Sequence, residues 1–168
     1  MTRAQTKRPE TVRLPRGAKL ACVVSTYHEE LTGAMLASAL ATLAEHGIAR
    51  EALEVVRAPG AFELPVVAQR LAQRADVAAV LCFGLVLKGE TEHDRHIAAA
   101  CAQGLMRVGL DTGTPVLFGV LTCATLEQAR RRAQREAEGG LDKGREVARA
   151  ALGALAALAA AAGEEGAA

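Results

Sequence analysis

Short apolar runs alternate with longer amphipathic segments along most of this 168-residue chain. Four of the runs are apolar almost throughout and rich in valine and leucine, which is typical of strands buried on both faces of a sheet. We expect these strands over residues 19–26, 53–58, 78–87 and 115–122. In between, apolar residues recur at helical spacing. This pattern predicts helices over residues 30–46, 62–75, 92–110, from 125 onward, and 142–162.

Local signals mark the ends of several of these helices. Gly47 follows the first helix as a C′ residue, and Pro65 fits the first turn of the second. Thr125 has a side chain suited to an N-cap, and Glu127 places a negative charge in the first turn after it. Strands that alternate with helices predict an α/β fold, with a central four-stranded parallel sheet covered by helices on both faces.

The length of the chain favours a single domain, which we expect over residues 18–162. Residues 1–17 are charged and contain two prolines, which predicts a flexible N-terminal segment. Within that segment, residues 11–14 could add a short edge strand to the sheet. Residues 163–168 are expected to form a disordered tail.

Composition narrows the classes of function. The formal net charge is +1, so no overall field attracts nucleic acid or an anionic membrane surface. Residues 1–17 lack the apolar centre of a secretory signal, and the small apolar stretch at 150–162 is short for a membrane span. The cysteines form no C-x-x-C pair, which argues against structural zinc or a disulfide framework and favours the cytoplasm. They are Cys22, Cys82, Cys101 and Cys123.

The residues that follow the strands are the candidates for chemistry, because the carboxyl ends of parallel strands meet at one edge of the sheet. Lys88, Gly89, Thr91 and His93 lie within six residues, just where a strand ends and a helix begins. Free N–H groups at a helix start can hold a phosphate. His93 can donate and accept protons near neutral pH. The segment is not a Walker A loop, so on its own it predicts only a site at a strand end.

Each candidate side chain also has a purely structural interpretation. Tyr27 follows the first strand and could stack on a planar heterocycle or fill core space. Glu63 could bind ligand hydroxyls or only stabilise a helix dipole. His93 and His96 form an H-x-x-H pair without an apparent third ligand, so no metal site is predicted. The arginines at 130–132 and 135 could bind phosphate or form a solvated helix face.

Three motifs, in order and in register, resemble the 6,7-dimethyl-8-ribityllumazine synthase family. They are PGAFELP at 59–65, GLVLKGETEH at 84–93, and TGTPVLFGVLT followed by LEQA between 112 and 129. The resemblance extends over residues 19–151, most of the chain. It implies a flavodoxin-like three-layer α/β/α sandwich that assembles as pentamers or as icosahedral shells of 60 subunits, with active sites between neighbouring subunits.

The resemblance also implies an activity. The family condenses 5-amino-6-(D-ribitylamino)uracil with 3,4-dihydroxy-2-butanone 4-phosphate to 6,7-dimethyl-8-ribityllumazine, releasing phosphate and water. This is the penultimate step of riboflavin biosynthesis, and it needs neither a metal nor an organic cofactor. The expected partners are therefore small-molecule substrates and further copies of the chain. Two other functions stay open: a flavin- or lumazine-binding paralogue without catalysis, and a shell-forming structural protein.

Site residues carry over from the family position by position. Tyr27 matches the aromatic that stacks on the pyrimidine, and His93 matches the proposed general acid/base. Phe118 matches an aromatic contributed by a neighbouring subunit, and Arg132 matches the phosphate-binding arginine. Three further sets match the ribityl-binding segment, the lining of the ring pocket and the phosphate-side loop. These sets are Ala61, Phe62 and Glu63; Val86 and Leu87; and Gly89, Glu90 and Thr91.

The chain departs from the family pattern in several places. Asparagine is usual where His28 stands, and glycine is usual at Gln134. Phe-Asp/Glu-Tyr commonly follows the catalytic histidine, whereas this chain has residues 94–96 as Asp-Arg-His. The loop before Lys143 is longer by about three residues, a change that surface loops tolerate. In the family such insertions accompany pentamers that do not close into shells, so we expect a pentamer; Lys143 is only a candidate for a second phosphate-side cation.

Overall fold

The computed structural model describes residues 14–163. Its four strands are all parallel and form one sheet in the order β2-β1-β3-β4. The strands are β1 (Lys19–Ser25), β2 (Leu53–Ala58), β3 (Val77–Leu87) and β4 (Val116–Cys123). All four predicted strands are confirmed, with ends that differ by no more than one residue. Of the edge strand predicted at 11–14, residues 11–13 lie outside the described part of the chain, and Leu14 is not in a strand.

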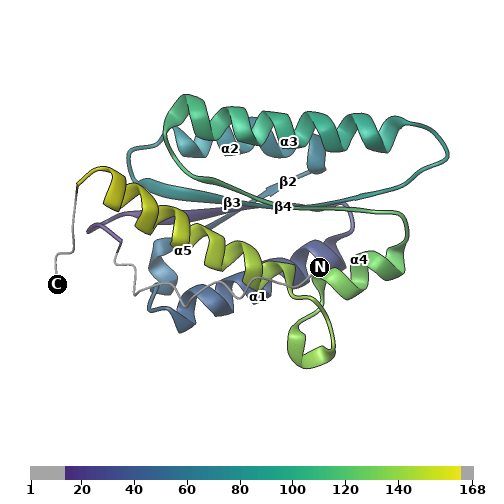
Figure 1. The fold of residues 1–168 in the computed structure, drawn as a ribbon, viewed down its shortest axis with the longest axis horizontal. Coiled ribbons are helices and arrows are strands. Elements are labelled where there is room, and N and C mark those ends of the chain that lie inside the picture. Colours follow the sequence, from purple (N-terminus) through teal and green to yellow (C-terminus); the bar gives the residue numbers. More distant parts are fainter. Residues whose placement is uncertain (1–13, 164–168) are drawn as a thin grey trace.

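Helices cover both faces of the sheet (Figure 1). One face packs against α2 (Leu64–Ala72) and α3 (His93–Thr112). The other packs against α1 (Glu29–Glu45), α4 (Leu126–Ala133) and α5 (Lys143–Ala161). The strand order is the flavodoxin-like one, in which the chain changes direction across the sheet between β1 and β3. The predicted three-layer α/β/α sandwich is therefore confirmed.

Alternate residues of the strands fill two separate cores. On β1, Leu20, Cys22 and Val24 face α1 and α5, whereas Ala21 and Val23 face α2 and α3. All five are fully buried. Because the central strands are covered on both faces, they are apolar at nearly every position, which explains the continuous apolar runs in the sequence.

The second predicted helix, 62–75, is wrong at both ends. Ala61–Glu63 form a 3-10 turn, and α2 covers only Leu64–Ala72, with Pro65 in its first turn as predicted. Gly60, just before the turn, is extended, so the chain must reverse from β2 into α2 within a few residues, which a tight turn accomplishes. At the other end, Val77 N–H donates to the Arg74 carbonyl as the chain turns into β3.

Helices α1, α3 and α5 begin and end within two residues of their predicted bounds, and α4 begins one residue after Thr125. Gly47 and Gly113 have φ values of +82° and +71°, as expected for residues that close a helix in the left-handed region. The Thr125 side chain accepts the N–H of Gln128, so the predicted N-cap of α4 is confirmed. Asp142 caps α5 by accepting the N–H of Arg145 at 3.0 Å.

Helices α1 and α5 approach each other closely where α5 begins. A Cβ atom on Gly144 would lie 2.1 Å from the Met35 carbonyl oxygen, far inside van der Waals contact. Beside this contact, the Ser38 hydroxyl donates a 2.5 Å hydrogen bond to the Asp142 carboxylate, and both side chains are buried. Glycine at position 144 is therefore required by packing rather than by backbone conformation.

A charged cluster joins the amino-terminal ends of the strands. The Arg74 guanidinium contacts Glu54 at 2.8 and 3.0 Å and Asp76 at 2.8 and 3.0 Å, and Lys19 lies within 4 Å of both acids. Hydrogen bonds from Arg74 lower the pKa of both carboxyls, and the two carboxylates raise the pKa of Arg74. The cluster ties the loop between α2 and β3 to β1 and β2.

All four cysteines are free and buried, as expected for small core residues. Cys22 and Cys123 lie in the core under α1 and α5, and Cys82 and Cys101 lie in the core under α2 and α3. Burial raises the pKa of Cys22 to about 12 and that of Cys101 to about 11, and it raises the pKa of the other two thiols as well. The thiols are therefore protonated near neutral pH.

None of the helices among residues 14–163 combines the length and the apolar character that crossing a membrane requires.

Candidate active site

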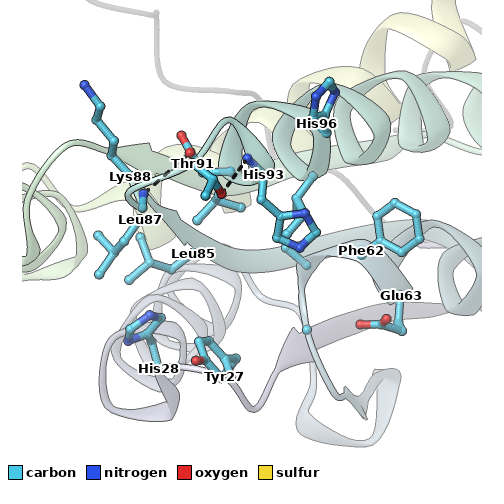
Figure 2. A pocket seen from close by; sticks show the side chains of 16 residues that line it. Tyr27, His28, Phe62, Glu63, Leu85, Leu87, Lys88, Thr91, His93 and His96 are labelled. Carbon is cyan, nitrogen blue, oxygen red and sulfur yellow. Dashed lines mark hydrogen bonds between the residues drawn. The ribbon is translucent and has the colours of Figure 1, made fainter.

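A cleft of about 770 Å³ opens at the carboxyl ends of the strands (Figure 2). Its walls are the loops that follow β1, β2 and β3, together with the start of α3. Nine of the twelve residues predicted for the site line this one cleft. They are Tyr27, Ala61, Phe62, Glu63, Val86, Leu87, Gly89, Thr91 and His93. Residues far apart in the sequence thus meet where the topology of the sheet predicts a binding site.

Two aromatic rings of the cleft are exposed rather than packed in the core. Tyr27 is 69% exposed and Phe62 is 60% exposed. The structural interpretation, in which these rings fill core space, is therefore wrong for both. Phe83, in the middle of β3, is by contrast completely buried and does fill core space. An exposed ring beside a cleft offers an apolar face to a planar ligand.

The loop between β3 and α3 forms the polar end of the cleft. The Lys88 N–H donates to the Cys123 carbonyl at 2.9 Å, which ties the start of this loop to β4. The next donors have only long local partners: Gly89 N–H to Asp94 Oδ1 at 3.5 Å, and His93 N–H to Thr91 Oγ1 at 3.4 Å (Figure 2). Since these bonds are weak and α3 is 20 residues long, the loop is suited to binding an anion.

His93 and His96 are both on α3 but point in different directions. In Figure 2 the His93 ring lies near Phe62 and on the same side of α3 as Tyr27, while the His96 ring points away from it. Among residues 14–163, no three His, Cys, Asp or Glu side chains are grouped so that they could hold a metal ion. His93 therefore lies beside Phe62 in the cleft, whose lining also includes His28 and His96.

Three predicted residues do not line this cleft. Phe118 and Arg132 line a separate pocket of about 330 Å³ between β4, α4 and α5. Glu90 lies exposed on the loop before α3 and lines neither pocket. Of the arginines at 130–132 and 135, only Arg132 faces the second pocket. Within one chain, Phe118 and Arg132 therefore lie in a different pocket from His93.

The second pocket also contains Lys143, the candidate for a second cation. Its ammonium is 2.6 Å from Glu146 Oε1, one turn further along α5. Four of the eight residues that line the pocket are apolar, and one of them, Phe118, is 41% exposed.

Seven residues of the cleft are not among the twelve predicted site residues. These are His28, Gly60, Leu85, Lys88, Asp94, His96 and Ile97. His28 and Gly60 lie directly after strand ends, so their positions could have been inferred from the strand pattern alone. Asp94 and Ile97 line the cleft because they lie on the side of α3 that faces it. Helical spacing alone does not determine which side that is.

Comparison with known proteins agrees with this arrangement. The sequence model of the family described as 6,7-dimethyl-8-ribityllumazine synthase matches residues 17–159. The enzyme of that name from Stenotrophomonas maltophilia (strain K279a) is 46% identical over 143 residues, covering 84% of this chain and 89% of the relative. 6,7-dimethyl-8-ribityllumazine synthase 1 of Caulobacter vibrioides is 46% identical over 138 residues, covering 82% and 88%. That of Xylella fastidiosa is 43% identical over 140 residues, covering 82% and 88%.

The matched region contains the whole sheet, the cleft and the second pocket. The chain belongs to the 6,7-dimethyl-8-ribityllumazine synthase family.

Proposed function

We propose that this chain condenses 5-amino-6-(D-ribitylamino)uracil with 3,4-dihydroxy-2-butanone 4-phosphate. The products are 6,7-dimethyl-8-ribityllumazine, phosphate and water, and the reaction is the penultimate step of riboflavin biosynthesis. Membership of the family supports this activity. The observation that carries it is the cleft, in which Tyr27, Glu63 and His93 come together from three different strand ends.

In this proposal the aminouracil binds along the apolar side of the cleft. The Tyr27 ring stacks on the pyrimidine, and Val86 and Leu87 line the ring pocket. Ala61, Phe62 and Glu63 bind the ribityl chain, whose hydroxyls donate hydrogen bonds to the Glu63 carboxylate.

The phosphate of the second substrate binds at the polar end. Gly89, Glu90 and Thr91 form the loop that faces it, and the start of α3 supplies N–H donors and a favourable dipole. Arg132 adds a guanidinium whose paired donors match phosphate oxygens. Because Arg132 and Phe118 line a different pocket from His93, we infer that a neighbouring copy of the chain supplies them.

The reaction then follows from positioning and proton transfer. The 5-amino group attacks the ketone carbon, and loss of water gives a Schiff base. Removal of the proton at C3 of the butanone then expels phosphate with the electron pair of its C4–O bond, and the resulting enol tautomerises to a ketone. Arg132 and the loop N–H groups stabilise the negative charge that develops on the phosphate. The ribitylamino nitrogen attacks this ketone carbon to close the second ring, and the ketone oxygen leaves as a second water. His93 moves protons in these steps, and much of the acceleration comes from holding two reactive molecules in contact.

We further propose a homopentamer as the working state, acting in the cytoplasm, with residues 18–162 as the domain that assembles. Exposed apolar side chains on α2 and α3 support self-association, since Val66, Met106 and Leu110 are each more than 60% exposed. Sedimentation velocity and electron microscopy of the purified protein measure the assembly. A monomer would contradict the proposal, and a closed shell of 60 subunits would replace the pentamer by the larger assembly.

The activity is tested by incubating the purified protein with both substrates and following the lumazine chromophore. Omitting the butanone phosphate provides the control. Absence of product at high enzyme concentration would contradict the activity, and tight lumazine binding without turnover would indicate a binding paralogue instead.

Coexpression tests whether sites are shared between copies. His93→Ala and Arg132→Ala chains, each impaired alone, should regain activity in mixed assemblies, because about one quarter of the shared sites then combine an intact cleft with an intact arginine. Mixed assemblies no more active than the average of the two variants would show that each chain holds its whole site.

A further inference from the structure

Tyr27 lacks the contacts that would normally hold an aromatic ring in place. Its backbone is tied to the neighbouring loop, since Tyr27 N–H donates to the Pro59 carbonyl at 3.1 Å. The ring itself is mostly exposed, and among the described residues no hydrogen bond is found for its hydroxyl. A stacking surface must be held at a fixed angle if it is to orient a ligand. Within one chain, the contact that holds the Tyr27 ring must therefore come from outside the core.

The neighbouring residue supplies that contact. The rings of Tyr27 and His28 have their centroids 4.9 Å apart and their planes at 83°, an edge-to-face arrangement. His28 is half-buried and lines the same cleft, and Figure 2 shows the two rings side by side, away from Thr91 and its loop. It is the one aromatic ring contact found among the described residues.

The backbone places the His28 ring in this position. His28 has φ 61° and ψ 44°, the left-handed region, which non-glycine residues seldom adopt. Its carbonyl accepts the N–H groups of Leu31 and Thr32, and the Thr32 hydroxyl donates to the Ser25 carbonyl at 2.8 Å. These bonds fix the bend between β1 and α1. Glycine would adopt this bend without strain, so the bend alone does not account for an imidazole ring at position 28.

We propose that His28 is a positioning residue, whose ring holds the Tyr27 ring so that its face is presented to the pyrimidine of the aminouracil substrate. The inference rests on the proposed function and extends it to a residue that does not itself react. It predicts an effect confined to one of the two substrates, because the phosphate binds at the other end of the cleft.

The first test uses variants that keep the bend but remove the ring. His28→Asn and His28→Gly both tolerate the left-handed backbone. In each, KM for the aminouracil should rise roughly threefold to tenfold, the range expected for losing an edge-to-face pair. KM for the butanone phosphate and the thermal midpoint should stay unchanged. His46→Asn, the same substitution at the other end of α1, is the matched control and should alter neither KM.

The second test observes Tyr27 directly. It is the only tyrosine in a chain without tryptophan, so the tyrosine band in near-ultraviolet circular dichroism reports this ring alone. The band should weaken in His28→Asn and His28→Gly and return in His28→Phe, which restores a ring that cannot titrate. If His28→Phe does not fold, the other two variants and His46→Asn decide the question.

Two results would overturn the role of His28. One is an unchanged tyrosine band together with an unchanged aminouracil KM in both ring-free variants. The other is an equal loss for both substrates with a lower thermal midpoint, which would indicate general destabilisation. If the wild-type protein forms no lumazine, the proposed function fails. Two measurements then still decide whether His28 positions the Tyr27 ring: the tyrosine band and the quenching of Tyr27 fluorescence by added lumazine.

Discussion

Ser38, in the middle of α1, donates its hydroxyl to the carboxylate of Asp142, which caps α5. The pair joins two helices across 104 residues of sequence, and both side chains are buried. Ser38→Ala removes a donor from a buried carboxylate, so we expect the free energy of unfolding to fall by about 1–3 kcal/mol. Urea denaturation measures the change. Asp142→Asn keeps an acceptor and tolerates the left-handed backbone, and it should cost less; a larger loss for Asp142→Asn would contradict this account.

The start of α5 also gives a prediction about two glycines on one helix. Gly144→Ala places a methyl group against the Met35 carbonyl, so the helices must move apart, and we expect a loss of about 2 kcal/mol or more. Gly153 has open space around its Cβ position. Gly153→Ala should therefore stabilise the protein by about 0.5–1 kcal/mol through helix propensity. Similar changes in thermal midpoint for the two variants would show that the close approach is not maintained in solution.

The charged cluster around Arg74 predicts a dependence of stability on pH. The pKa values of Glu54 and Asp76 are lowered in the folded protein, so their contribution is complete above the unfolded values of about 4. It is lost as the pH falls through the folded values. Arg74→Gln should therefore reduce stability at pH 7 and flatten its decline below about pH 4. Denaturation curves across this range measure the slope. Arg107→Gln, which breaks one exposed pair with Asp111, should leave the slope nearly unchanged.

The two histidines of α3 should differ in their kinetic effects. His93→Ala removes the group placed for proton transfer, and we expect kcat to fall by about 100-fold or less, the lower end for general acid–base catalysis. Positioning supplies much of the remaining acceleration. His96→Ala should have a much smaller effect, since that ring points away from His93 (Figure 2). Steady-state kinetics on both variants decides the matter, and a greater loss at His96 would reverse the assignment.

Arg132 and its neighbour Arg131 form a matched pair on α4. Arg132→Ala should raise KM for the butanone phosphate by roughly tenfold to 100-fold, since a charge-assisted hydrogen bond is lost. KM for the aminouracil should change little. Arg131 does not line the pocket, and Arg131→Ala should leave both values near those of the wild type. Equal effects in the two variants would indicate that the combined positive charge of α4 attracts the phosphate, rather than a defined contact with Arg132.

Much of the fold could be predicted because its signals are local. The strands are apolar at most positions since both faces of the sheet are covered, and Thr125 and Gly47 carry the chemistry that their helix ends require. The start of α2 could not be predicted in the same way. Whether residues 61–63 continue a helix or make a tight turn depends on where β2 delivers the chain, which is a property of the sheet.

The residues of the site also fall into two groups: those that local sequence signals reveal and those that depend on the path of the chain in space. Tyr27, Glu63 and His93 could be found because strand ends meet at one edge of a parallel sheet. The assignment of Phe118 and Arg132 to a separate pocket depends on the path of β4 and α4 in space, and no sequence spacing gives it. The contact between His28 and Tyr27 depends on a left-handed bend that residues other than glycine seldom adopt.

The distribution of the four cysteines has a practical consequence for studying motion. Each core contains one pair of thiols, and burial keeps all of them protonated and shielded from reagents. Alkylation can proceed only during transient opening, so its rate measures how often a given core is exposed. Mass spectrometry of labelled peptides would separate Cys22 and Cys123 from Cys82 and Cys101. The native sequence thus contains built-in probes that can show whether the two helical layers separate from the sheet together or independently.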